Sequence, residues 1–210
     1  MEKLKSNFQN MTIVLTGVSV LCGALLAFFY NLTEEPRNAA AQATLNEGIE
    51  QVMGGKCTVE DPQEVTRNVD GKDLKYIIYK TDKGTAVQAT DPNGFGGNLT
   101  VLVGFNDEGE ILGYTILETA ETPGLGAKAD TWFQKSENGG QGGKACIVGL
   151  NPANVNMTVS KDGGDIDAIT ASTITSRSFL RAVTQAYNTF KGNAETDGNT
   201  SATAQECTNE

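Results

Sequence analysis

The N-terminal part of the chain contains one long apolar run. Residues 11–30, MTIVLTGVSVLCGALLAFFY, include no charged side chain. At about 1.5 Å of rise per residue, a helix of this length crosses a hydrocarbon layer of roughly 30 Å. A cleaved signal peptide would have a shorter apolar region and a small-residue cleavage site, and neither is evident. The pattern therefore predicts a retained transmembrane helix over residues 11–30.

The charges that flank this run predict its orientation. Lys3 and Lys5 precede the run, whereas Glu34 and Glu35 follow it. Because positive charge favours the cytoplasmic side, residues 1–10 should be cytoplasmic and the remainder extracytoplasmic. In a bacterium this describes a single-pass protein of the inner membrane, surrounded by lipid, with its main domain on the periplasmic side.

A helical period follows the span. Within residues 31–54, four apolar residues recur at helical spacing and predict a juxtamembrane helix over Thr33–Met53. They are Ala40, Leu45, Ile49 and Val52.

Short alternating or apolar runs then predict strands. Glycine-containing turn signals at 82–84, 91–94 and 106–109 separate them, and this spacing predicts an antiparallel meander. The predicted strands are 74–80, 84–90, 98–106 and 110–119, with a further strand over 155–160.

Two helices complete the predicted domain, which spans residues 55–191. ADTWFQK, beginning at Ala129, predicts a short helix, and a longer one is predicted over Thr175–Phe190, ending at Gly192. One face of the longer helix carries Phe179, Ala182, Val183, Ala186 and Phe190. Residues 192–210 are polar and predict a disordered tail. The fold class is therefore α+β: one transmembrane helix, then a mainly antiparallel sheet packed by helices.

Composition excludes several kinds of chemistry. The chain has no histidine, which rules out a Ser-His-Asp triad and histidine-ligated metal or haem bound by this chain alone. Its four cysteines form no C-x-x-C pair, which argues against a zinc or iron–sulfur cluster. Cys57 and Cys146 could pair in an oxidising compartment or remain separate thiols. A net charge of −10 argues against a nucleic-acid partner.

Two stretches stand out from this scaffold. DAITASTITS, from Asp167 to Ser176, concentrates five hydroxyl side chains at the start of the last helix, and ETPGLG, Glu121–Gly126, follows a predicted strand. Taken alone, the first can be a helix N-cap with spare hydroxyls and the second a turn that leaves the sheet.

Together, the two stretches resemble the covalently flavinylated FMN-binding domains of the Rnf and Na⁺-translocating NADH:quinone reductase complexes. That family carries a flavin-attachment pattern D-x-x-(S/T)-G-A-T, which Asp167–Thr173 resembles. Ala171 and Ser172 stand where the family usually has Gly and Ala, and both are small enough that we expect the turn to persist. ETPGLG matches the second family signature, and Gly94–Asn106 resembles its glycine-bearing strand entry. The short chain is more similar to the Rnf G subunits than to the longer C subunits of the quinone reductases.

The resemblance implies roles for individual residues. Thr173 would carry one FMN through a phosphoester on its hydroxyl, at a helix start where backbone N–H groups favour an anion. Asp167 matches the acidic position that the family's flavin transferase requires. We infer that the other hydroxyls of the cluster supply capping and phosphate contacts: Thr170, Ser172, Thr175 and Ser176.

The ETPGLG stretch should form the opposite wall of the flavin site. Its backbone and Thr122 would meet the polar edge of the isoalloxazine ring, and Leu125 would pack on the ring. Glu121 belongs to the same wall, and Gly124 would leave room for the ring.

The implied function is electron relay by an electron-carrying subunit of an ion-translocating ferredoxin:NAD⁺ oxidoreductase complex, assembled with other membrane and peripheral subunits. This chain would be part of a redox-driven translocase rather than a free-standing enzyme. Three alternatives remain open: the C subunit of a sodium-translocating quinone reductase, another flavinylated extracytoplasmic reductase, and a membrane-anchored binding module without a cofactor.

Overall fold

A computed structural model describes residues 8–69 and 72–196. The chain divides into two compact units, Met1–Leu45 and Asn46–Glu210. Each unit is described below by itself.

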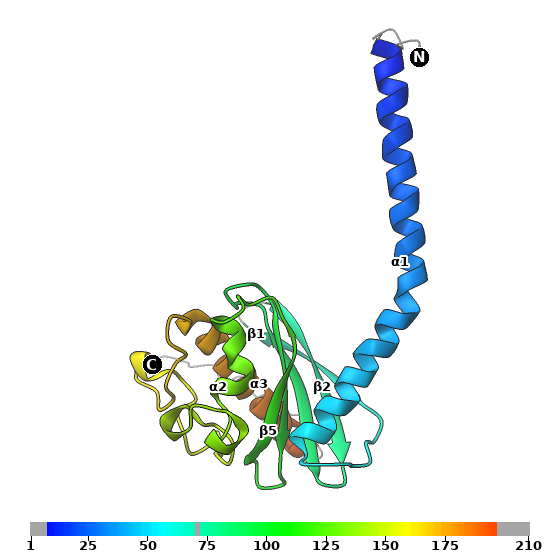
Figure 1. Cartoon of the computed structure of the whole chain (residues 1–210). Helices are drawn as coiled ribbons and strands as arrows, with labels where there is room; N and C mark the ends of the chain where they lie inside the picture. Colours follow the sequence, from blue (N-terminus) through cyan, green and yellow to red (C-terminus); the bar gives the residue numbers. More distant parts are fainter. Residues whose placement is uncertain (1–7, 70–71, 197–210) are drawn as a thin grey trace, which may run out of the picture. The chain divides into compact units, whose positions relative to one another are not determined.

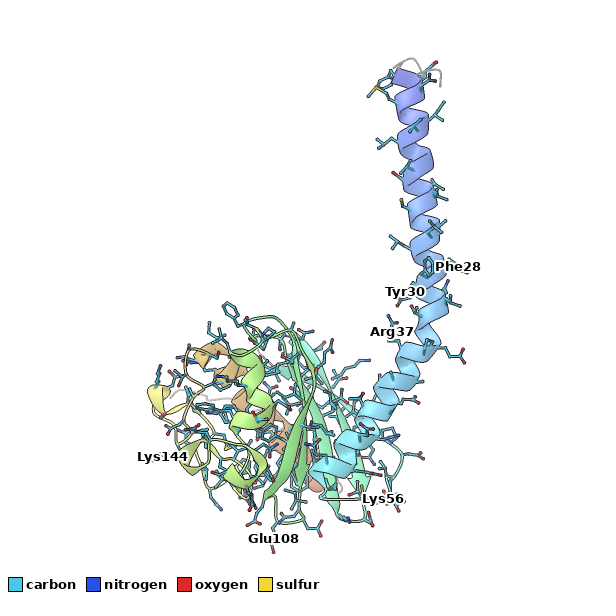
Figure 2. All side chains as sticks on the ribbon, viewed as in Figure 1. Phe28, Tyr30, Arg37, Lys56, Glu108 and Lys144 are labelled. Carbon is cyan, nitrogen blue, oxygen red and sulfur yellow. The ribbon has the colours of Figure 1, made fainter. Side chains whose placement is uncertain are left out.

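The first unit is formed by helix α1, Phe8–Val52, which continues into the second unit. Apolar side chains around its N-terminal part are exposed, and Leu26 is one of them. Another is Phe28 (Figure 2). Among the described residues, α1 is the one helix long and apolar enough to cross a membrane. The helix runs on through Pro36, so the predicted span and the predicted juxtamembrane helix are one continuous element.

An aromatic side chain ends the apolar run and a cationic one follows it. The Arg37 guanidinium lies 5.0 Å from the centre of the Tyr30 ring (Figure 2), and its Nη2 donates a hydrogen bond of 3.4 Å to the tyrosine hydroxyl. Tyrosine and arginine side chains each combine an apolar part with a polar end, so they are favourable at the boundary between hydrocarbon and water.

The second unit is built on a five-stranded antiparallel sheet in the order β1-β2-β3-β4-β5 (Figure 1). This confirms the predicted meander and the α+β class. The strands are β1 Gln63–Val69, β2 Lys72–Thr81, β3 Gly84–Asp91, β4 Leu99–Phe105 and β5 Ile111–Thr119. The interior strand β4 is buried throughout, as a strand covered on both faces should be.

Two strand assignments differ from the sequence prediction. Strand β1 was not predicted because QEVTRNV is polar and largely exposed, and it forms by pairing with β2. The predicted strand over 155–160 is wrong. Met157 and Val159 are buried in the core, but that segment makes only an isolated bridge between Val159 and Ile166.

Helix α3, Thr173–Thr196, packs on one face of the sheet against β3 and β4. The predicted apolar face is confirmed: Phe179 stacks on Phe133 at 4.5 Å between ring centres, and Ala182, Val183 and Ala186 are buried. Phe190 packs at the margin of this core. A short helix, α2 (Ala129–Trp132), precedes Phe133 and confirms a helix at the start of ADTWFQK, although it ends three residues before the predicted stretch does.

The end of α1 covers the opposite face of the sheet. Ile49 and Val52 are buried there, whereas Ala40 is exposed, so only the end of the predicted apolar face packs. Glycines in β4 and β5 permit this close approach, because a Cβ at Gly104 or Gly113 would lie 3.0–3.2 Å from the Val52 carbonyl oxygen.

The prediction that Gly192 ends the last helix is wrong, because α3 continues to Thr196. A Cβ at position 192 would collide with the Arg67 guanidinium of β1, so this glycine permits a close contact rather than a stop. The predicted tail lies outside the described residues from 197 onwards.

The described cysteines Cys22, Cys57 and Cys146 are free thiols. The structure therefore holds Cys57 and Cys146 as separate thiols rather than as a disulfide. Burial raises the pKa of the Cys57 thiol, which makes its reactive thiolate form scarcer.

Candidate functional site

The two sequence signatures meet at one pocket. The start of α3, the segment after β5 and the loop between β3 and β4 enclose a cavity of about 360 Å³. This size falls within the range of small-molecule sites, roughly 300–1,000 Å³. Its walls are Phe95, Glu121, Thr122, Leu125, Gly126 and residues 171–175.

The ETPGLG wall is a tight turn. The Leu125 N–H donates to the Thr122 carbonyl at 3.2 Å, with Pro123 second and Gly124 third in the turn. Gly124 has φ of +77°, the conformation that a type II turn requires at its third position. Gly124 does not line the pocket, and a Cβ on it would meet no atom within 4 Å. Glycine is therefore needed at position 124 for the turn. The glycine of this segment that allows other atoms to come close is Gly126.

Glu121 joins all three segments of the pocket. Its Oε2 accepts a 2.8 Å hydrogen bond from the Thr175 hydroxyl of α3, and its Oε1 accepts a 3.3 Å bond from the Gly96 N–H. Both Glu121 and Thr175 are buried. A Cβ on Gly126 would lie 2.5 Å from the Glu121 carboxylate and 2.7 Å from the Thr175 hydroxyl. Only glycine at position 126 leaves this contact intact.

The chain enters α3 through a hydroxyl-supported turn. The Ser176 hydroxyl accepts a 2.9 Å hydrogen bond from the Ile169 N–H and donates to the Ser172 carbonyl at 3.0 Å. The same carbonyl accepts the Ser176 N–H, which places Ser172 at the N-cap position. Ser176 is fully buried, so its hydroxyl supports the turn from inside.

Ala171 has φ of +63°, and it is the one non-glycine residue with a positive φ in residues 8–69 and 72–196. A left-handed conformation costs a Cβ-bearing residue roughly 1–2 kcal/mol. This is a physical reason for glycine at the corresponding place of the attachment pattern. The turn survives in this chain with alanine, as we expected, but in a strained conformation.

Thr173 is the hydroxyl of α3 that is open to the pocket. It is the first residue of the helix and is half-buried in the pocket wall. Its hydroxyl makes no hydrogen bond within the part of the chain that the structure describes. Helix geometry leaves the first backbone N–H groups without an intrahelical partner, so an anion bound at this hydroxyl would meet donors and the positive end of the dipole.

Four predicted site residues lie outside the pocket wall: Asp167, Thr170, Ser176 and Gly124. Thr170 is exposed, and neither it nor Asp167 lines the cavity. The exposed Asp167 carboxylate accepts a 2.7 Å hydrogen bond from the Ser160 hydroxyl, and its backbone carbonyl accepts the Trp132 indole N–H at 3.2 Å. Asp167 thus holds the approach to the attachment turn and remains accessible to another protein.

Three residues of the wall were not predicted as site residues. Phe95, Ile174 and Ala171 line the pocket, and the first two are exposed apolar side chains. GFGG, Gly94–Gly97, belongs to the stretch that resembles the family's strand entry, and a single aromatic residue among glycines marks Phe95 in the sequence. Ile174 carried a signal too, because its apolar side chain interrupts a run of hydroxyls.

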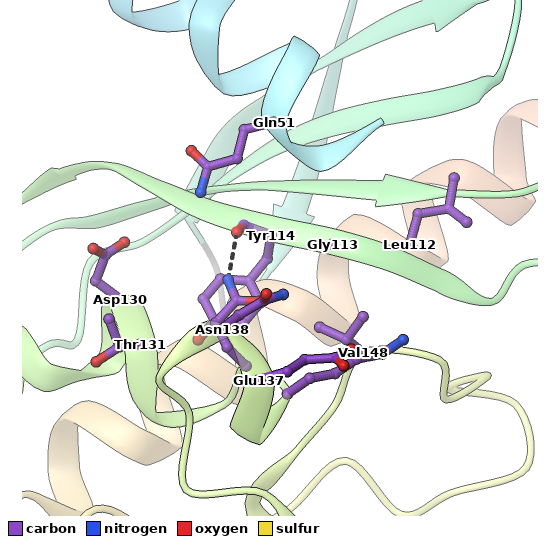
Figure 3. A pocket seen from close by; sticks show the side chains of 11 residues that line it. Gln51, Leu112, Gly113, Tyr114, Asp130, Thr131, Glu137, Asn138 and Val148 are labelled. Atoms are coloured by element: carbon purple, nitrogen blue, oxygen red, sulfur yellow. Dashed lines mark hydrogen bonds between the residues drawn. The ribbon is translucent and has the colours of Figure 1, made fainter. Parts of the chain in front are cut away.

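A larger and more polar pocket, of about 510 Å³, lies along the edge strand β5 (Figure 3). Leu112, Gly113 and Tyr114 form one side, and Gln51 from the end of α1 reaches toward it. Gln134 donates a 3.0 Å hydrogen bond to the Tyr114 carbonyl within this pocket. None of the predicted site residues lines it, so the smaller pocket is the candidate site.

The residues of the smaller pocket fit FMN. Phe95, Leu125 and Ile174 supply apolar surface for a flat ring system, and Thr173 offers an unengaged hydroxyl at a helix start. Gly126 leaves room for the Glu121–Thr175 contact that holds the wall together. Thr122 lies exposed in the wall, where it can meet a polar ring edge.

Comparison with known proteins agrees with this fit. Residues 94–188 match the family model described as the FMN-binding domain. Three relatives are each named as the G subunit of an ion-translocating oxidoreductase complex. The protein from Cronobacter sakazakii is 31% identical over 186 residues, covering 85% of this chain and 88% of the relative. The protein from Shewanella oneidensis is 30% identical, covering 83% and 85%. The protein from Shewanella piezotolerans is 27% identical, covering 86% and 88%.

The matched FMN-binding segment contains every residue of the pocket wall. The similarity to the relatives extends over most of both chains, beyond the matched segment. The chain therefore belongs to the family of G subunits of ion-translocating oxidoreductase complexes, and it contains an FMN-binding domain.

Proposed function

We propose that this protein carries one FMN, bound covalently through a phosphoester to the Thr173 hydroxyl, and relays electrons within an Rnf-type ferredoxin:NAD⁺ oxidoreductase complex. The observation that carries the proposal is the Thr173 hydroxyl itself. It lies unengaged in the wall of an apolar pocket at the start of α3.

The neighbouring hydroxyls support this choice of residue. Thr175 is 1% exposed and is bonded to Glu121, and Ser176 is buried and engaged in the turn. Thr170 is exposed but lies outside the pocket wall. Thr173 combines access for a modifying enzyme with a place in the pocket.

The bound flavin would supply one- and two-electron transfer chemistry. The protein's own residues have a different task. Thr173 and the start of α3 would hold the phosphate, and the apolar side chains of Phe95, Leu125 and Ile174 would hold the ring. The hydrogen bonds of Glu121 keep the three segments of the pocket together. Covalent attachment also prevents loss of the cofactor, since a tether keeps it at a high effective concentration.

Attachment is tested by expressing the full chain together with a flavin transferase and measuring intact mass and in-gel flavin fluorescence. One FMN should be found on the peptide containing Thr173. Thr173→Ala should remove it and leave the fold unchanged, because this hydroxyl has no partner among the described residues. Thr170→Ala is the matched control and should keep the flavin. Flavin on Thr170 or Thr175, or none in the presence of active transferase, would contradict the assignment.

We also propose that residues 31–210 are extracytoplasmic, with other subunits of the complex and the flavin transferase acting on that side of the inner membrane. Support comes from the apolar helix and the lysines before it. An alkaline phosphatase reporter fused after Lys191 should be active, and a β-galactosidase fusion at the same place inactive. The reverse result would place the domain in the cytoplasm.

The C subunit of a sodium-translocating quinone reductase remains the alternative with the same flavin site. Co-purification distinguishes the two, because the accompanying subunits identify the complex. A module without a cofactor predicts an unmodified mass.

A further inference from the structure

The most exposed apolar side chain of the pocket wall is Phe95. It is 69% exposed and lies in the loop Gly94–Gly97, between β3 and β4. Three glycines surround it, so its ring is the one side chain that this stretch presents to the cavity.

The backbone of this loop is held firmly although the ring is exposed. The Gly96 N–H is bonded to the buried Glu121 carboxylate. A Cβ on Gly96 would collide with the Ala120 carbonyl, and a Cβ on Gly94 would lie 2.7 Å from Glu121 Oε1. The glycines therefore let the loop lie directly against the ETPGLG segment. The backbone at Phe95 is therefore held in place, while the Phe95 ring is exposed to water.

Two further apolar side chains belong to the same wall. Leu125 is 44% exposed and Ile174 is 48% exposed, and they come from the segment after β5 and from α3. Three segments distant in sequence thus each place one large apolar side chain at a single cavity. Exposed apolar surface gathered in this way is favourable only when something covers it.

We propose that Phe95 is a cover for the flavin, packing its ring against the isoalloxazine and shielding that ring from water. This inference rests on the proposed function. Aromatic rings attract flat ring systems through offset or edge-on contacts, and an anchored loop with one free ring can make such a contact without moving its backbone. Phe95 is a positioning residue in this role and does not itself transfer electrons.

The experiment uses the full-length, flavin-loaded chain in detergent, without partner subunits. Phe95→Ala should expose the flavin, so that iodide quenches its fluorescence more strongly than in the wild type. Phe95→Trp should lose most of its flavin fluorescence, because an indole in contact with an excited flavin quenches it. Both variants should retain one FMN on Thr173.

Leu112 provides the matched control. It is an exposed apolar residue on β5 that lines the other pocket. Leu112→Ala and Leu112→Trp should leave iodide quenching and fluorescence yield at wild-type values. The native Trp132 is present in all variants and therefore cancels in the comparison.

The outcomes separate this inference from the proposed function. If wild-type protein carries no flavin on Thr173, the proposed function fails. If flavin is attached but the Phe95 variants match the Leu112 variants, Phe95 does not cover the ring and the inference is overturned. In that event the exposed ring would be available for contact with a neighbouring subunit.

Discussion

At the residue scale, the hydroxyl cluster divides into two kinds of side chain. Thr175 and Ser176 are buried and use their hydroxyls to bond Glu121 and the turn before α3. Thr173 faces the pocket instead. Residues of one chemical type within four positions therefore have different roles, and burial with hydrogen bonding decides between them.

Ala171 provides a test of strain in the attachment turn. Ala171→Gly should increase the free energy of unfolding by about 0.5–1 kcal/mol, since relief of the left-handed conformation exceeds the extra chain entropy of glycine. Urea unfolding of the unflavinylated chain, followed by Trp132 fluorescence, measures the change.

The reverse substitution at a comparable position serves as the control. Gly163 has φ of +85° and no atom within 4 Å of a built Cβ, so Gly163→Ala introduces strain without a collision. It should destabilise the protein by about 1 kcal/mol. A loss of stability in Ala171→Gly would show that the left-handed conformation is not the governing feature of the turn.

At the element scale, the pocket depends on three segments that are far apart in sequence. Glu121 connects the loop after β3, the segment after β5 and the first turn of α3. A second connection runs from the end of β3, where the buried Asp91 accepts hydrogen bonds from Ser178 and Arg181 of α3. These contacts place the helix start against the sheet edge that carries the ETPGLG turn.

Thr175→Val tests the first of these connections. It keeps the side-chain shape, removes the hydroxyl and leaves the buried Glu121 oxygen with one donor fewer. Unfolding free energy should fall by about 1–3 kcal/mol. Thr184→Val is the control: that hydroxyl bonds only to the Leu180 carbonyl of its own helix among the described residues, so the change should stay within about 0.5 kcal/mol.

Flavin attachment to Thr175→Val shows whether the site still assembles when the domain is less stable. Thr173 makes no hydrogen bond to Glu121 or Thr175 among the described residues. The Thr175→Val variant should therefore still accept FMN under conditions in which its domain is folded. Equal stability of the two valine variants would contradict a bracing role for Thr175.

At the scale of the whole molecule, buried tyrosines connect the helices to the sheet. The Tyr114 hydroxyl donates to the Ala129 carbonyl at 2.8 Å and accepts the Phe133 N–H at 3.1 Å, linking β5 to α2. Burial raises the pKa of Tyr114 far above its ordinary value, and it also raises the pKa of Tyr76 and Tyr79. The folded domain therefore favours the neutral form of all three.

This predicts a loss of stability in alkali. Below the unfolded-state pKa of about 10, tyrosine is neutral in both states and its contribution is fully present. As pH rises above that value, unfolded tyrosines ionise while folded ones stay neutral. Stability should then fall by up to about 1.4 kcal/mol per pH unit for each tyrosine kept neutral.

Urea unfolding in a pH series around 10 measures this slope. Tyr114→Phe lowers stability at neutral pH by leaving its two backbone partners unpaired, but it should make the alkaline slope shallower. A wild-type stability that stays flat across the series would exclude ionisation of these tyrosines as the cause.

The sequence by itself determined the elements whose patterns are local. The uncharged run of residues 11–30, four strands with their turns and the apolar face of α3 were all predicted from period and turn residues, and the fold class followed. The two signatures were recognised as parts of one site because their residue types match a family pattern, and the structure brings them to one pocket.

Tertiary structure decided whatever depends on distant partners. Strand β1 forms although its residues are polar, because β2 offers it a complete edge. Residues 155–160 alternate apolar and polar side chains but form only an isolated bridge to Ile166. Helix α3 continues past Gly192, and the missing Cβ there leaves room for the Arg67 guanidinium. Thr175 differs from Thr173 because its hydroxyl meets Glu121, which is distant in the chain. Phe95 likewise joins the pocket wall only because its loop packs against the segment after β5. Local sequence encodes period and turns, whereas burial, hydrogen-bond partners and the space for a Cβ exist only once the chain has folded.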